Sequence, residues 1–127
     1  MNADRHRRMR TLVFGTLSTV VGAATAIGAV LLALRLRDGE GIDLLAHPRF
    51  AFTAWIFPAY AAVLLAIGYS LLRHGRLARG HLAAVGTVIV ATTASELIVG
   101  DAFRAVAHLV LGAIVVWQLR DFLPGRE

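Results

Sequence analysis

Long apolar runs separated by short polar segments dominate the sequence. Two of these runs, residues 11–34 and 50–72, contain no charged residue. The third, residues 81–100, contains one acidic residue, and the fourth, residues 102–119, contains one arginine and one histidine. A helix of roughly 20 mostly apolar residues spans the ~30 Å hydrocarbon core of a bilayer, so each run predicts a transmembrane helix.

Hydrocarbon offers no hydrogen-bond partner to a free backbone group, which leaves the α-helix as the conformation for such runs. The composition supports a membrane setting, because 57 % of the 127 residues are apolar and only 17 % are charged. A soluble domain of this length has too little interior to bury so much apolar surface. We therefore predict an all-α integral membrane protein, with four antiparallel transmembrane helices in a single bundle that forms one domain over residues 1–127.

The connections between the runs differ in length and charge. Residues 35–49 form a long outer loop, in which residues 43–47 are predicted to make an amphipathic turn at the membrane surface. Residues 73–80 form a short basic inner loop. The third and fourth runs meet at Gly100 and Asp101, which predicts a tight antiparallel hairpin.

Arginines lie at the ends of the apolar runs, which is the pattern of a topology signal. All thirteen Lys and Arg positions are arginine, and the net charge is +5. Four arginines precede the first run, three lie in the 73–80 loop and two follow the fourth run, against four on the opposite side. Since positive flanks remain in the cytoplasm, both termini are predicted to be cytoplasmic in a multi-pass protein of the cell (inner) membrane. The same clustering argues against a nucleic-acid partner.

The first run is expected to be retained rather than removed as a signal peptide. It is longer than the apolar core of a signal peptide, which has about 7–15 residues. It also ends at Arg35 and Arg37 rather than at a small-residue cleavage site.

Small residues recur at helical spacing in the first three runs and predict close packing between helices of the same chain. Tyr60 and Tyr69 of the second run each need a partner for the hydroxyl group, which serines and threonines of the other runs are expected to supply. The small-residue stripes comprise Gly15, Ser18, Thr19, Gly22, Ala23 and Ala26 in the first run, Ala54, Pro58, Ala62 and Ala66 in the second, and Thr87, Ala91 and Ser95 in the third.

A polar cluster lies where the third and fourth runs meet. Glu96 is five residues before Asp101 and His108 is seven after it, so at 1.5 Å per residue both sit roughly 8–10 Å below the turn. Arg104 and His108 share a helix face with Asp101. Trp55 is expected at a similar level on the second run. These five residues form the candidate polar site, which is expected to face outward.

Three interpretations of this cluster remain open. A charge at the centre of a membrane helix costs about 2.5–3.5 kcal/mol, which pairing or protonation removes. Glu96 could therefore pair with His108 or Arg104 and lock the hairpin. Alternatively, Glu96 carries a proton, a cation or a ligand while His108 and Arg104 tune it. The cluster could also contact a neighbouring subunit.

Other chemistries find little support. The chain has no cysteine, which excludes thiolate metal sites and disulfides, and its five histidines are too scattered to predict a metal site. A b-type haem needs two axial ligands at one depth, and His108 would need a second chain to complete the pair. A quinone site could be formed by His108, Trp55 and a tyrosine, but the spacing of these residues in the sequence does not predict one. We predict no cofactor and, because no nucleophile–base motif or phosphate loop is present, no enzymatic activity.

The sequence therefore favours a non-enzymatic accessory or structural subunit of a membrane assembly. The alternative is a small oligomeric transporter or channel, coupled to protons or cations, that uses Glu96 with His108 and Arg104. Either function implies the lipid bilayer as a partner, together with further copies of the chain or a larger membrane complex.

Reporter fusions at the two ends of the chain test the predicted orientation. Because nine of the thirteen arginines flank the same side, reporters that work only in the cytoplasm should be active at both termini. Activity of a periplasmic reporter at either terminus would contradict the orientation.

Overall fold

Helices are the only regular secondary structure among the residues that the structure describes. The structure is a computed structural model and describes residues 2–38 and 48–124. Its elements are α1 (Asn2–Arg37), α3 (Pro48–His74), α4 (Arg79–Ile98), α5 (Ala102–Leu119) and a 3₁₀ turn, η1 (Arg120–Phe122). The prediction of an all-α protein with four long helices is confirmed over this part of the chain. The predicted amphipathic turn at residues 43–47 lies outside the described residues.

All four α-helices are long and apolar enough to cross a membrane, judged by length and composition. Several of them extend past the predicted apolar runs: α1 begins at Asn2 rather than residue 11, and α3 ends at His74 rather than residue 72. The length of an apolar run reflects the thickness of the hydrocarbon that a span must cross. The helix itself can be longer, because its internal hydrogen bonds also form in water. At the other boundary, α4 ends at Ile98 rather than residue 100, because Gly100 adopts φ +82° and starts the turn.

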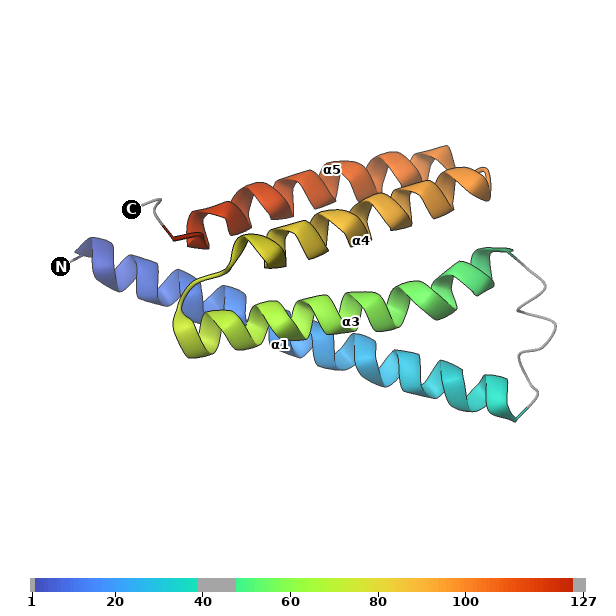
Figure 1. The fold of residues 1–127 in the computed structure, drawn as a ribbon, viewed down its shortest axis with the longest axis horizontal. Helices are drawn as coiled ribbons and strands as arrows, with labels where there is room; N and C mark the ends of the chain where they lie inside the picture. Colours follow the sequence, from blue (N-terminus) through green and yellow to red (C-terminus); the bar gives the residue numbers. More distant parts are fainter. Residues whose placement is uncertain (1, 39–47, 125–127) are drawn as a thin grey trace.

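Two helical hairpins make up the bundle, α1 with α3 and α4 with α5 (Figure 1). They meet chiefly where α3 packs against α4. The start of α1, the end of α5 and the α3–α4 connection lie at one end of the bundle, which we call the terminal end. The α4–α5 turn lies at the opposite end, which we call the turn end.

Glycines bring the backbones of α1 and α3 close together. Gly15 and Gly22 of α1 are buried against leucine side chains of α3. On α3, a Cβ atom added to Gly68 would lie 2.9 Å from the Thr19 backbone nitrogen and 3.1 Å from the Gly15 carbonyl oxygen. These small residues of the first run therefore pack inside the chain, as their spacing predicts.

The prediction of a packed small-residue stripe on the second run is wrong at Pro58, Ala62 and Ala66, and the side chain of Ala54, its fourth member, lies outside what the structure describes. Pro58, Ala62 and Ala66 are exposed, whereas Ala61 and Gly68 are buried. The physical reason is that nearly every face of a membrane helix is apolar, so hydrophobicity does not distinguish the packed face from the face that meets lipid.

The buried core lies towards the terminal end and joins the two hairpins. The Leu77 N–H in the α3–α4 loop donates to the Phe122 carbonyl oxygen at 2.9 Å, which ties this loop to the end of α5. Gly75, with φ +68°, allows the chain to turn just before this bond. The core residues are Ile67, Leu71, Leu77, Val85, Ile89, Leu119 and Phe122.

Arg10 connects α1 to the end of α5. Its Nη2 donates to Gln118 Oε1 at 3.2 Å and lies 3.6 Å from Asp121 Oδ2. The guanidinium also lies over the rings of Phe14 and Phe122, 5.9 and 5.7 Å from their centroids. Cation–π contacts of this kind contribute about 0.5–1 kcal/mol each at exposed sites. The terminal end is therefore held closed by both apolar and polar contacts.

Substitution of Gly68 by alanine tests the close approach of α1 and α3. The added methyl group must push the two backbones apart, which should lower the free energy of unfolding by about 1–3 kcal/mol. Gly28→Ala on α1 is the control, because no atom lies within 4 Å of an added Cβ there. Unfolding in mixed detergent micelles measures both variants. Equal stabilities would contradict the described interface.

Candidate functional site

Asp101 and Arg104 of the predicted cluster pair with each other at the turn end. Asp101 is the N-cap residue of α5, and its Oδ1 accepts a hydrogen bond from the Arg104 backbone N–H at 3.1 Å. The Arg104 Nε also lies 3.4 Å from Asp101 Oδ2, and the arginine side chain is 57 % exposed. This arrangement satisfies a free amide at the start of α5 and is a local helix cap.

Glu96 and His108 lie on the two facing helices of the α4–α5 hairpin. The register follows from Gly112, where an added Cβ would collide with the Ile89 side chain. In antiparallel helices with this pairing, His108 stands opposite Thr93, about three residues from the level of Glu96. Three residues correspond to roughly 4.5 Å along the helix axis. The two residues are therefore at levels less than one helical turn apart along the axis of the hairpin.

One polar atom of each side chain is buried without a partner. Glu96 Oε2 and His108 Nδ1 are covered by surrounding protein atoms and have no hydrogen-bond partner among the described residues. Within that part of the chain, no hydrogen bond or ion pair joins Glu96 to His108. A buried polar atom left unsatisfied costs about 1–3 kcal/mol, so both atoms require an explanation. The bond that would lock the hairpin through these residues is not formed in this structure.

The hydroxyl groups beside Glu96 are already engaged. Thr92 Oγ1 lies 2.8 Å from the Val88 carbonyl oxygen and 3.2 Å from the Tyr60 hydroxyl. Because a threonine has one hydroxyl proton and a carbonyl only accepts, Thr92 donates to Val88 and Tyr60 donates to Thr92. Ser95 Oγ donates to the Ala91 carbonyl at 2.8 Å. Tyr60 thus has the expected partner, and it connects α3 to α4.

Trp55 stands apart from the rest of the cluster. It belongs to α3 in the other hairpin and is 81 % exposed. It does not line the cavity between the hairpins, described next. The structure therefore pairs Asp101 with Arg104, places Glu96 and His108 on one hairpin, and leaves Trp55 facing outward.

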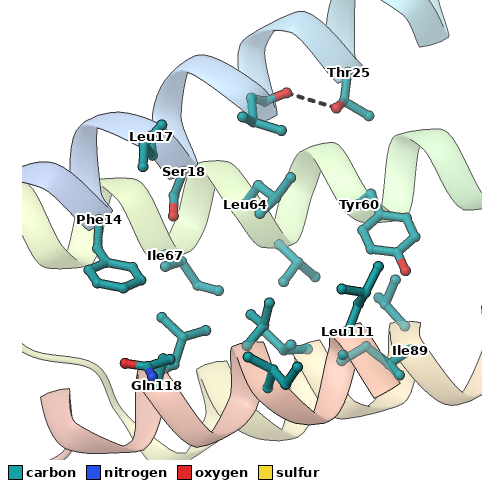
Figure 2. Close-up of a pocket in the computed structure, with 18 of the residues that line it drawn as sticks. Phe14, Leu17, Ser18, Thr25, Tyr60, Leu64, Ile67, Ile89, Leu111 and Gln118 are labelled. Atoms are coloured by element: carbon teal, nitrogen blue, oxygen red, sulfur yellow. Dashed lines mark hydrogen bonds between the residues drawn. The ribbon is translucent and has the colours of Figure 1, made fainter. Parts of the chain in front are cut away.

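A cavity of about 660 Å³ lies between the two hairpins and is lined by α1, α3, α4 and α5. Figure 2 shows its mainly aliphatic walls, with the Tyr60 hydroxyl directed towards the α4–α5 hairpin. Of the five predicted site residues, His108 lines this cavity. The other polar lining residues, which the sequence pattern did not mark as functional, are Ser18, Thr25, Tyr60 and Gln118. Gln118 was detectable from the sequence, because it is an uncharged polar residue within the apolar run 102–119.

Comparison with known proteins finds no match: no protein-family model, curated protein or solved structure matches this chain. Its function is therefore inferred from its own residues.

Substitutions of Asp101 distinguish a helix cap from a functional acid. Asp101→Ala removes the acceptor for the Arg104 N–H and should lower the free energy of unfolding by about 0.5–2 kcal/mol. Asp101→Asn keeps a capping oxygen and removes only the charge, so its thermal unfolding in detergent should stay close to that of the unmodified protein. Equal destabilisation of both variants would show that the charge, rather than the cap, is what matters.

Proposed function

We propose that this chain is a non-enzymatic multi-pass membrane protein that takes up and releases a proton at Glu96 and His108, as a small proton-coupled transporter or channel. One observation carries the proposal: Glu96 Oε2 and His108 Nδ1 are buried, lack partners among the described residues and belong to titratable side chains. Ionisable groups placed within membrane helices are most often functional, because their burial is costly.

A proton suits this site better than a hydrated cation. Both atoms are covered by the chain itself, so a cation or a side chain from another subunit could reach them only if the hairpin opened. A proton requires no added volume. The neighbouring cavity is also mainly apolar, and such cavities stay dry, which disfavours the passage of hydrated ions.

The roles of the predicted residues follow from their contacts. Glu96 is the proposed proton carrier, and His108, which lies on the facing helix less than one turn away along the axis, is the group that exchanges a proton with it or tunes its charge. Arg104 is exposed and paired with Asp101, so we assign it to the turn end of the hairpin rather than to the proton site.

An accessory subunit is the second candidate. The observation that favours it is the large apolar surface of α1, whose buried residues are Gly15 and Gly22. Large apolar side chains of the same helix, including Leu17, Ile27 and Leu31, are exposed. Lipid covers such a surface in a free protein, and a partner helix would cover it in an assembly.

Proton flux into liposomes tests the leading proposal. The purified protein is reconstituted into vesicles that contain a pH-sensitive dye, and a potassium gradient with valinomycin drives protons inward. The unmodified protein should acidify the vesicles faster than protein-free controls. Glu96→Gln keeps the size of the side chain but cannot titrate, so its rate should fall to that of protein-free vesicles.

Two controls separate transport from stability. Asp101→Asn should retain the flux, because this acid caps α5 outside the proposed proton site. Glu96→Gln should unfold at nearly the same temperature as the unmodified protein. Loss of stability with unchanged flux would assign Glu96 to hairpin locking. Absence of flux in the unmodified protein, with a larger partner retained through mild-detergent purification, would favour the accessory subunit.

A further inference from the structure

The cavity between the hairpins has the length of one lipid chain. Its lining runs from Phe14 to Thr25 on α1 and from His108 to Leu119 on α5. At 1.5 Å per residue, each stretch covers roughly 15 Å. This is half of the ~30 Å hydrocarbon thickness of a bilayer, which is the depth of one leaflet.

The walls of the cavity favour an alkyl occupant over water. Its volume of about 660 Å³ lies within the range of small-molecule sites, about 300–1,000 Å³. Four of its five polar lining residues lie in two groups: Ser18 and Gln118 towards the terminal end, and Tyr60 and His108 towards the turn end. The space between these groups is bordered by aliphatic side chains (Figure 2). Water has few partners there, whereas an apolar chain removes its own surface from contact with water.

Hydrogen-bond donors are available at the terminal end of the cavity. Gln118 Oε1 accepts from Arg10, and since arginine can only donate, this bond leaves the Gln118 NH₂ group as a donor for another molecule. No other bond of Gln118, and none of Ser18, is formed among the described residues. In Figure 2 the Ser18 hydroxyl points from α1 into the space between the hairpins. Two donors beside a guanidinium suit an acidic head group.

The charge of the terminal end favours the same kind of ligand. The start of α1, the end of α3, the start of α4 and the end of α5 all lie there (Figure 1). Basic ends attract anionic amphiphiles from the adjacent leaflet. The arginines on these segments are Arg5, Arg7, Arg8, Arg10, Arg73, Arg76, Arg79 and Arg120.

The head group must be small. Phe14 and Phe122 meet edge to face at 5.5 Å, and Arg10 lies over both rings, so this end of the bundle is closed above the cavity. A carboxyl group fits beneath such a closure more readily than a phosphoglycerol head that carries a second chain. We propose that the cavity binds a long-chain fatty acid, with its carboxyl group at Ser18 and Gln118 and its alkyl chain directed towards Tyr60 and His108.

Photolabelling in nanodiscs tests this site. The protein is embedded in phosphatidylcholine and exposed to palmitic acid that carries a diazirine near the end of its chain. Mass spectrometry should find the label on residues that line the cavity. Oleic acid should compete for labelling, and oleyl alcohol should compete roughly tenfold less well, because it lacks the acidic group. Phosphatidylcholine is already in large excess, so labelling that persists in it excludes an ordinary phospholipid chain as the favoured occupant.

Matched tryptophan substitutions on α5 provide the controls. Leu111 lines the cavity and Leu109 does not, and both are exposed leucines. Leu111→Trp should fill the site and reduce labelling several-fold, whereas Leu109→Trp should be labelled like the unmodified protein. Gln118→Leu should weaken competition by oleic acid roughly tenfold and leave that by oleyl alcohol unchanged.

The outcomes separate this inference from the proton site. Glu96→Gln should bind the fatty acid normally, because Glu96 does not line the cavity. Labelling that oleic acid fails to displace, or equal labelling of Leu111→Trp and Leu109→Trp, would overturn the fatty-acid site without bearing on proton flux.

Discussion

The need to satisfy polar groups without water underlies the whole structure. In hydrocarbon, backbone bonds must close within each segment, which makes every predicted span a helix. Six side-chain hydroxyls of the described helices follow the same rule, because each donates to the carbonyl oxygen four residues earlier in its own helix, at 2.7–2.8 Å. They belong to Thr19, Thr25, Thr87, Thr92, Thr93 and Ser95. Among the described residues, Glu96 and His108 each keep one buried atom without a partner, and the Ser18 hydroxyl in the cavity also lacks one.

The same constraint explains why the bundle is closed at one end and hollow further along. Gly15, Gly22 and Gly68 draw α1 tightly onto α3, and Arg10 attaches α1 to the end of α5. Beyond that attachment the two hairpins are linked chiefly through α3 and α4, including the Tyr60–Thr92 bond. The space that opens between α1 and α5 is apolar because its walls are helices that are long and apolar enough to cross a membrane. A cavity of this kind in a lipid solvent offers a natural place for a lipid chain, and its one histidine comes from the proposed proton site.

Much of the fold was predictable from the sequence because hydrocarbon imposes a length and a composition on each span. The runs at residues 11–34 and 102–119 needed only their apolar character to be recognised as helices. Asp101 was predictable as a hairpin residue, since a tight turn between two spans requires polar residues there. The packed face of α3 was not predictable, because Ala62 and Ala61 are equally apolar and only the crossing with α1 decides which one is buried. The cavity depends on the same crossing. The position of Ser18 and Gln118 in its lining follows from the way α1 and α5 face each other, which the sequence does not show.

Infrared difference spectroscopy of the protein in bilayers, recorded as the bath is acidified and returned to neutrality, addresses the central claim most directly. If Glu96 exchanges a proton within the hairpin, one component of the carbonyl band of uncharged carboxyl groups should appear and disappear reversibly, and this component should be missing in Glu96→Gln. Difference spectra that are the same in both proteins, with no component lost in Glu96→Gln, would contradict a proton-handling role for this hairpin.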